Sequence, residues 1–183
     1  MTDEAGRRRD DERRRRILEV ARERADAEGW GAVTTRHLAT AIGYTQPVLY
    51  RHFPGGKAEI MLAVALEGFA ELTRRCRAAV AGRRGRPAIE TAARTYLDFA
   101  REHPAVYEAM FEQVIGARFA SADTPQVLRE GFETLAAVLG DDGETTTEVF
   151  WAALHGMSEL ERAGRMRAEH RDARVAELAA RFG

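Results

Sequence analysis

The 183-residue sequence predicts an all-α protein with about nine helices. Apolar residues recur at helical spacing, as in Ile17, Val20, Ala21 and Ala25, which occupy positions i, i+3, i+4 and i+8. Glycine and proline separate these periodic segments at intervals typical of helices in globular proteins. No stretch alternates apolar and polar residues as a half-buried strand would.

Predicted helix boundaries fall where glycine, proline or threonine favours a helix end. Glycine adopts the left-handed backbone that follows many helices, and a threonine hydroxyl can cap a first turn. Proline is tolerated in that turn because its missing N–H has no intrahelical partner there. The boundary residues are, in chain order, Gly29, Thr34, Thr35, Gly43, Thr45, Pro47, Pro54, Gly82, Pro87, Pro104, Pro125, Gly140 and Gly143. The expected helices cover residues 12–28, 34–43, 46–53, 57–80, 87–102, 104–115, 125–140, 144–163 and 170–181, with a loop at 116–123 and a turn at 141–143.

Composition excludes several classes of protein. The single cysteine rules out a disulfide framework and a cysteine-rich zinc module. The longest apolar run, residues 60–66, is far too short to span a membrane, and the charged N-terminus does not resemble a signal peptide. We therefore expect a cytoplasmic protein. Residues 1–57 carry 12 basic and 9 acidic side chains, whereas the remainder carries 16 and 20, so the front of the chain is the half suited to a polyanion.

Residues 34–53 predict a helix-turn-helix, two short helices joined by a tight turn. The apolar positions are those that such a unit must bury, and a small residue stands where the helices cross. Gly43 supplies the positive φ that the turn requires. The expected packing residues are Leu38, Ala39, Ile42, Tyr44, Val48 and Leu49, with Tyr44 filling the turn.

The sequence resembles the TetR family of bacterial transcription regulators. The string Leu49-Tyr50-Arg51-His52-Phe53, followed after a short gap by Lys57, carries the resemblance most specifically. The other matching positions are Ala21, Gly29, Thr34, Thr35, Arg36, Leu38, Ala39 and Gly43. Further along, Trp151-Ala-Ala-Leu-His155-Gly156, residues 97–104 and Tyr107 resemble a subclass of TetR C-terminal domains with a Trp-His-Gly motif. The resemblance implies a DNA-binding domain at residues 12–72 and a ligand-binding and dimerisation domain at 73–183.

The resemblance places the second short helix in the DNA major groove. Gln46 could then pair with adenine, Pro47 could contact a thymine methyl group, and Thr45 could both cap the helix and reach a phosphate. Arg51 is a further exposed position of this helix. Phosphate contacts are expected from Tyr50, His52 and Lys57, and from Thr35 and Arg36 at the start of the preceding helix. The alternative for Tyr50 and His52 is that their rings only pack in the core.

Two arginine-rich segments have open interpretations. The clusters at residues 7–9 and 13–16 could form an arm that reaches DNA or a disordered tail that only adds solubility. Residues 84–87, Arg-Gly-Arg-Pro, match the core of peptides that bind the minor groove, but their place between two helices favours a plain loop.

The C-terminal half carries the expected effector site and dimer interface. The ligand-pocket candidates, from a wider set of aromatic and methionine residues that includes Phe119, are Tyr96, Phe99, Tyr107, Phe111, Trp151 and His155. A hydrogen-bonded core histidine is an equally good interpretation of His155. The interface candidates are Val149, Ala152, Ala153, Leu160, Val175, Leu178 and Phe182.

The sequence thus predicts a homodimeric repressor that binds a near-palindromic site in double-stranded DNA and is released by a small apolar or aromatic molecule. We expect no enzymatic activity, cofactor, metal or membrane association, because no nucleophile motif, phosphate loop or close set of metal ligands is present. Two alternatives remain. One is a helical enzyme or metal-binding bundle, and the other is a DNA-binding regulator without a ligand.

Overall fold

The computed structural model describes residues 2–112, 124–140 and 143–183, and every regular element in these ranges is a helix. The expected loop at 116–123, Phe119 and the first two residues of the expected turn at 141–143 lie outside the described residues. No helix in the described ranges is long and apolar enough to cross a membrane. The elements are α1 (Thr2–Glu28), η1 (Trp30–Ala32), α2 (Thr35–Ala41), α3 (Gln46–His52), α4 (Gly56–Val80), α5 (Arg86–Glu102), α6 (Pro104–Glu112), α7 (Gln126–Leu139), α8 (Glu144–Arg162), η3 (Ala168–His170) and α9 (Arg171–Phe182).

The helices form two compact units. The first contains α1 to α3, α4 as far as Glu67, and α6, whereas the second contains α4 from Gly68 onward, α5 and α7 to α9. Helix α6 belongs to the first unit because it packs against α1. The expected domain boundary between residues 72 and 73 stays a prediction, because it cuts the chain once, whereas the first unit also includes α6 from further along the chain.

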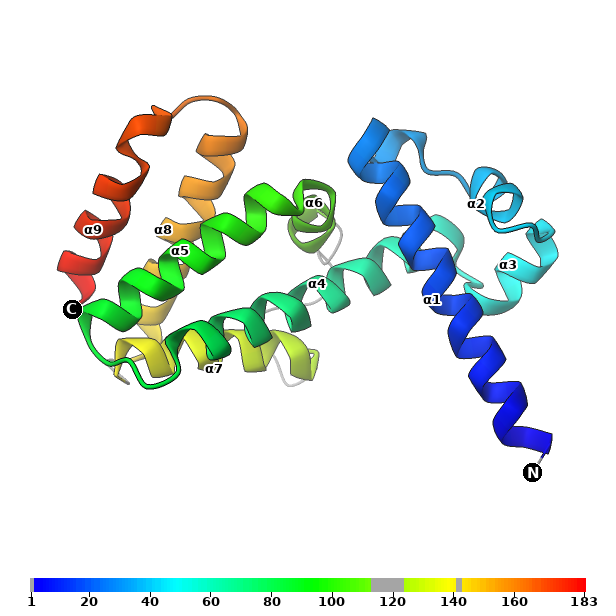
Figure 1. Ribbon diagram of the computed structural model, residues 1–183, viewed down its shortest axis with the longest axis horizontal. Coiled ribbons are helices and arrows are strands. Elements are labelled where there is room, and N and C mark those ends of the chain that lie inside the picture. Colours follow the sequence, from blue (N-terminus) through cyan, green and yellow to red (C-terminus); the bar gives the residue numbers. More distant parts are fainter. Residues whose placement is uncertain (1, 113–123, 141–142) are drawn as a thin grey trace. The chain divides into compact units, whose positions relative to one another are not determined.

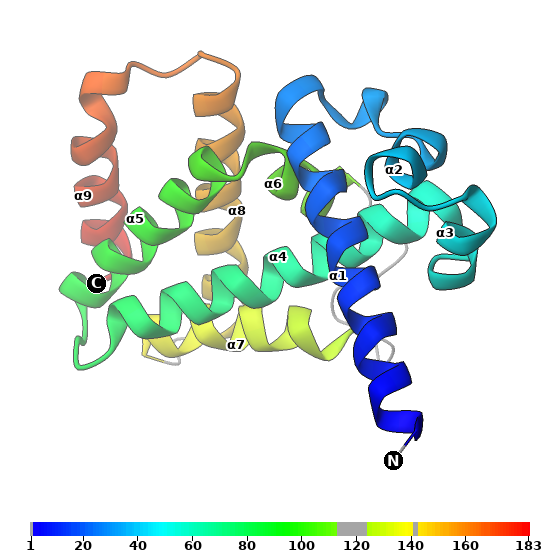
Figure 2. The ribbon, with the colours of Figure 1, turned by 45° about the vertical axis from the view of Figure 1, so that its right-hand side comes forward.

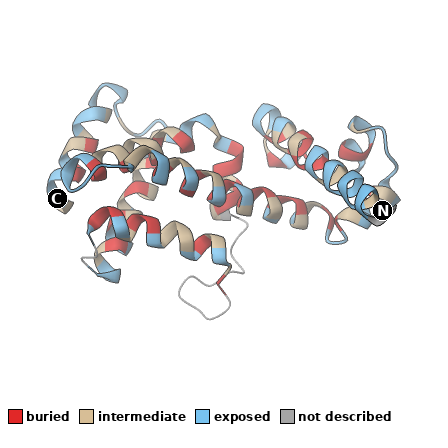
Figure 3. Cartoon of the chain, turned by 60° about the horizontal axis from the view of Figure 1, so that its bottom comes forward, coloured by how far each residue is buried: buried red, intermediate tan, exposed pale blue. Residues whose placement is uncertain are grey.

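Helix α1 begins at Thr2, well before the start expected at residue 12. Side chains three and four residues apart are neighbours on a helix, and opposite charges at these spacings stabilise it. Arg8 pairs with Glu4 at 2.8 Å, and Arg13 pairs with Asp10 at 3.0 Å. The first arginine cluster is therefore part of a helix and not an irregular tail, and its side chains are exposed (Figure 3). Its contact with DNA stays a prediction.

Trp30 joins three elements of the first unit. Its indole Nε1 donates a hydrogen bond to the Ala105 carbonyl at 2.7 Å, and its own carbonyl accepts one from the Lys57 ammonium. The Asp26 carboxylate also accepts a hydrogen bond from the Ala105 N–H at 3.2 Å. Because the first N–H groups of a helix lack intrahelical partners, Asp26 stabilises the start of α6 on α1.

In the second unit, α8 and α9 both lie alongside α5 (Figures 1 and 2). Ion pairs reinforce the apolar packing. Arg171 contacts Asp98 of α5 at 2.9 Å and Glu161 of α8 at 3.3 Å, and Arg174 contacts Glu161 at 2.7 Å. These pairs fix α9 against two neighbouring helices.

We expect Trp30→Phe to lower the free energy of unfolding by about 1–2 kcal/mol. The phenyl ring keeps most of the buried apolar area but leaves the Ala105 carbonyl without its indole donor. Urea unfolding followed by circular dichroism measures the change. Trp151→Phe, at a half-buried position elsewhere, serves as the control for loss of an indole. Equal stability of Trp30→Phe and wild type would show that the bond to Ala105 contributes nothing.

Candidate nucleic-acid interface and internal cavity

Helices α2 and α3 form the expected helix-turn-helix. Leu38, Ala39 and Leu49 are buried, and Gly43 has a φ of 71° in the turn between the helices. The Thr34 hydroxyl accepts a hydrogen bond from the His37 N–H at 3.2 Å, which caps α2 as expected. Helix α1 lies beside these two helices (Figure 2) and contacts both of them.

Tyr44 does not fill the turn, because its side chain is 39% exposed. The Arg13 guanidinium of α1 lies 5.6 Å from the centre of the Tyr44 ring, and its Nε lies 3.4 Å from the Tyr44 hydroxyl. Partial exposure together with contact to a cation suits an amphipathic ring at the rim of the unit better than one in the core.

Helix α3 presents an exposed polar surface formed by Thr45, Gln46, Pro47, Tyr50 and Arg51. Thr45 occupies the position before the helix, but its side chain makes no capping hydrogen bond. This differs from the expected capping role, and it leaves the hydroxyl available to a partner. Arg36 of α2 is also exposed.

Thr35, Tyr50 and Lys57, three of the expected phosphate-contact residues, form hydrogen bonds within the protein. The Tyr50 hydroxyl lies 3.5 Å from the Thr35 hydroxyl, and the Lys57 ammonium donates to the Trp30 carbonyl. Nε2 of His52 is buried and has no hydrogen-bond partner in the described structure. His52 could therefore reach a phosphate only through Nδ1.

Tyr50 also explains the glycine at the start of α4. Gly56 has a φ of 61°, and a Cβ atom there would lie 3.3 Å from Cε1 of the Tyr50 ring. The absence of a side chain lets the ring of Tyr50 lie against the α4 N-terminus. Helices α3 and α4 are thereby held together at the exposed surface.

Arg14, a member of the second arginine cluster, has a positioning role that was not predicted. Its Nη1 donates a hydrogen bond to the His52 carbonyl at 2.7 Å, and its guanidinium lies 4.1 Å from the centre of the Phe53 ring. Arg14 therefore fixes the C-terminal end of α3. The available signal was its place one helical turn before Ile17 on the apolar stripe of α1.

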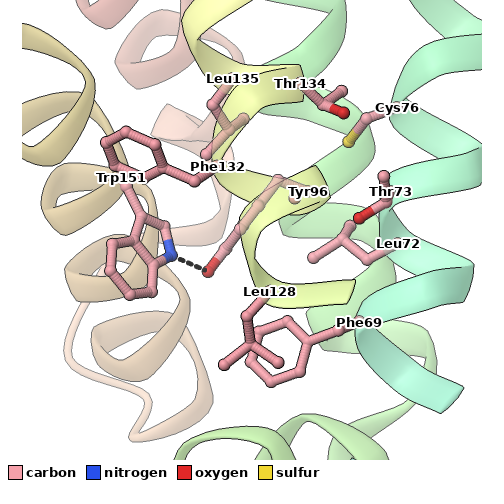
Figure 4. A pocket seen from close by; sticks show the side chains of 11 residues that line it. Phe69, Leu72, Thr73, Cys76, Tyr96, Leu128, Phe132, Thr134, Leu135 and Trp151 are labelled. Carbon is pink, nitrogen blue, oxygen red and sulfur yellow. Dashed lines mark hydrogen bonds between the residues drawn. The ribbon is translucent and has the colours of Figure 1, made fainter. Parts of the chain in front are cut away.

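A small cavity of about 40 Å³ lies among α4, α5, α7 and α8 in the second unit (Figure 4). The Trp151 Nε1 donates a hydrogen bond to the Tyr96 hydroxyl at 3.3 Å across it. Burial raises the pKa of the Cys76 thiol to about 12, so this thiol stays protonated and unreactive at neutral pH. The other lining residues are Phe69, Leu72, Thr73, Leu128, Gly131, Phe132, Thr134 and Leu135.

Of the predicted pocket residues, the cavity brings together Tyr96 and Trp151. Phe99 instead packs under the Arg75 guanidinium, which lies 5.5 Å from its ring centre. His155 does not line the cavity, and burial lowers its pKa, which favours the neutral ring. Tyr107 and Phe111 of α6 pack on each other in the first unit with ring centres 4.7 Å apart. Phe132 belongs to the wider set of aromatic candidates, whereas Leu128 was not predicted, although its place four residues before Phe132 on α7 is an apolar-face signal.

The predicted interface residues separate into exposed and buried sets. Helix α8 exposes Val149 (55%), Ala152 and Leu160 (38%), and Ala153 is half-buried. Val175 and Leu178 are buried within the unit because the apolar stripe of α9 faces α5 of the same chain. Phe182 is half-buried, with its ring 5.1 Å from that of Phe150. Of the two helices, α8 alone offers large exposed apolar side chains from the predicted set.

Two family models match the chain. The model described as bacterial regulatory proteins of the tetR family matches residues 17–64, which contain the helix-turn-helix. The model described as a tetracyclin repressor-like C-terminal domain matches residues 89–182, about half of the chain. The finer assignment to the Trp-His-Gly subclass stays a prediction.

Individual proteins agree with these matches. Rv0681 of Mycobacterium tuberculosis, an uncharacterised HTH-type transcriptional regulator, is 32% identical over 162 residues, which cover 84% of this chain and 72% of that protein. A protein of unknown function from Rhodococcus sp. RHA1 has the same fold, with a TM-score of 0.74 at 22% identity over 93% of this chain and 92% of its own. The TetR family regulator PfmR from Thermus thermophilus matches with a TM-score of 0.65 at 23% identity over 90% of this chain and 97% of its own.

The matched segments coincide with the structural features described above. The helix-turn-helix with its exposed α3 surface lies in the first matched segment, and helices α5 to α9 lie in the second. The chain therefore belongs to the TetR family of DNA-binding transcription regulators.

Proposed function

We propose that the protein is a homodimeric repressor that reads a near-palindromic operator with α3 and is released from it by a small apolar molecule. The exposed polar surface of α3 is the observation that carries the DNA-binding part of this proposal. Leu49 is fully buried beneath that surface, and Arg14 fixes the end of the helix. The reading side chains therefore project from a rigid support, as base recognition requires.

Position on α3 divides the candidate contacts into two kinds. Gln46 and Pro47 stand in the first turn, where side chains of a recognition helix reach base edges. Tyr50 stands beside the α4 N-terminus and Thr35, where backbone N–H groups favour an anion. Gln46 is thus assigned to bases and Tyr50 to a phosphate. Lys57, with one donor bound to Trp30, is assigned to positioning the α4 N-terminus and to phosphate attraction through its remaining donors.

We expect Gln46→Ala to weaken binding to the selected operator by about 1–3 kcal/mol and to relax preference at particular base pairs. Tyr50→Phe removes only a hydroxyl and should weaken binding to operator and scrambled duplexes alike. Fluorescence anisotropy titrations on both duplexes at several salt concentrations measure these losses. Gln126→Ala, an exposed glutamine on α7, is the matched control. Equal losses on both duplexes for Gln46→Ala would refute its base-reading role.

The exposed apolar face of α8 supports the proposed homodimer. One helix-turn-helix reads too few base pairs for selectivity, so a pair is needed on a two-part site. Val149, Ala152 and Leu160 lie on α8 at spacings of three and eight residues, which place them on one face. This face is the proposed interface, in place of the buried residues of α9.

The variant Val149→Glu with Leu160→Arg should be monomeric, because both substitutions put charge into the proposed interface without disturbing the protomer core. Sedimentation velocity at micromolar concentration measures the assembly state. Leu62→Arg, at another exposed apolar position, is the control and should leave the dimer intact. Unchanged sedimentation of the double variant would exclude this face as the interface.

The cavity beside Trp151 supports the proposed effector site. Its walls are apolar and aromatic, and they include the hydroxyls of Thr73, Thr134 and Tyr96. The volume of about 40 Å³ has room for little more than a water molecule. A ligand must therefore displace the half-buried side chains of Phe132 and Trp151, which makes binding a change of conformation.

Helix α4 is the proposed lever between effector and DNA. It is one continuous helix of 25 residues whose first turns belong to the DNA-binding unit and whose residues between Phe69 and Cys76 line the cavity. An effector in the cavity would favour a different packing around Phe69 and Leu72, and this packing would change the conformation of α4. A shift from mostly bound to mostly released requires a preference of about 5.5 kcal/mol for the released state.

In a Trp30→Phe background, Trp151 is the only tryptophan and reports on the cavity. We expect small aromatic compounds that change its fluorescence to lower operator affinity as well. Tyr96→Phe, which removes the hydrogen-bond acceptor of the indole, should blunt that response and spare operator affinity without compound. Parallel fluorescence and anisotropy titrations measure both effects. A broad screen in which no compound lowers operator affinity would favour a constitutive regulator, the alternative that the small cavity volume supports.

A further inference from the structure

A groove of about 580 Å³ lies in the second unit at the ends of four helices. The last turns of α4, the first turn of α5, the last turns of α7 and the end of α9 form its walls. It shares Thr134 with the cavity beside Trp151 and no other lining residue. The groove is therefore a separate site, large enough for an organic molecule without rearrangement.

Three arginines line the groove without a carboxylate partner among the described residues. Arg77 donates to the Thr134 hydroxyl at 2.9 Å and to the Glu130 carbonyl at 3.4 Å, and Arg83 donates to the Ala79 carbonyl at 2.7 Å. These acceptors are neutral, so they orient Arg77 and Arg83 without cancelling their charge. Arg84 is exposed and joins no ion pair in the described ranges.

This lack of a carboxylate partner contrasts with six other arginines of the same unit. Arg75, Arg94, Arg101, Arg171, Arg174 and Arg181 all form ion pairs with carboxylates. Glu133 is the one acidic side chain among the described lining residues of the groove. With the terminal carboxylate of Gly183 also counted, the three guanidinium groups still outnumber the acidic groups of the described lining, so this part of the groove carries an excess of positive charge.

The floor of the groove is apolar. Ile89 and Val138 are buried beneath it, and the half-buried ring of Phe182 forms one wall. Guanidinium groups at the rim and apolar side chains in the floor are complementary to a molecule with an anionic head and an apolar body. A simple inorganic anion would leave the floor unused, and a neutral apolar molecule would leave the arginines unused.

We propose that this groove binds a small amphipathic anion, an apolar ring system or chain that carries a carboxylate, sulfonate or phosphate. The site is distinct from the α3 surface and shares only Thr134 with the lining of the proposed effector cavity. Arg83 and Arg84 hold the anionic head, and Ile89, Val138 and Phe182 contact the apolar body.

The fluorescent anion 8-anilinonaphthalene-1-sulfonate tests the proposal, with N-phenyl-1-naphthylamine as the neutral probe of nearly the same aromatic skeleton. The full-length double variant Arg83→Gln with Arg84→Gln should bind the sulfonate about threefold to tenfold more weakly than wild type, because exposed charge pairs each contribute modestly. Its affinity for the neutral probe should not change. Arg165→Gln with Arg167→Gln removes the same charge from the exposed segment after α8 and should bind both probes as wild type does.

A second variant tests the location. Ala137 is exposed and lines the groove, so Ala137→Trp should block the sulfonate, whereas Ala137→Ser should retain it. Thermal unfolding checks that each variant is folded. Equal loss of both probes in the arginine variant, or equal loss in the control pair, would overturn the proposal. Stoichiometric displacement of the sulfonate by an A/T-rich duplex, lost in the arginine variant, would assign the groove to nucleic acid instead and would also overturn it.

Discussion

The hydrogen bonds around Trp30 are the contacts on which the DNA-binding unit depends. The indole binds the first turn of α6, and the carbonyl of the same residue binds Lys57 in the first turn of α4. A single residue, Trp30, thus fixes the starts of α4 and α6. Because Gly56, the residue before Lys57, lies against the ring of Tyr50, the contacts of Trp30 also help to position α3.

Helix α3 depends on tertiary contacts for its stability. A helix of seven residues is not stable in isolation, since nucleation costs more than so few hydrogen bonds return. Burial of Leu49, the Arg14 bond to its last carbonyl and the ring of Tyr50 against Gly56 supply the missing stability. These contacts all lie on one side of α3, so they stabilise the helix and at the same time leave Gln46, Pro47 and Arg51 exposed.

The second unit contains two different sites that could hold a small molecule, the cavity beside Trp151 and the groove beside Arg84. The cavity beside Trp151 has a volume of only about 40 Å³ and is lined by Phe132 and Trp151, so occupancy there requires movement, which suits a switch. The groove beside Arg84 is open and needs no movement. A molecule in the first can change the conformation of the unit, whereas one in the second adds stability to a conformation already present.

The sequence by itself determined the helical class, most helix boundaries and the helix-turn-helix, because periodicity, glycine at Gly43 and the Thr34 cap are local signals. Tertiary structure decided which face of each helix is covered. Leu178 and Val149 are both apolar residues on C-terminal helices, yet α5 buries the first and leaves the second exposed. Likewise, Tyr107 and Trp151 share the same aromatic character, and only chain folding places one in each unit. Burial depends on contacts between segments distant in sequence, which no local pattern records.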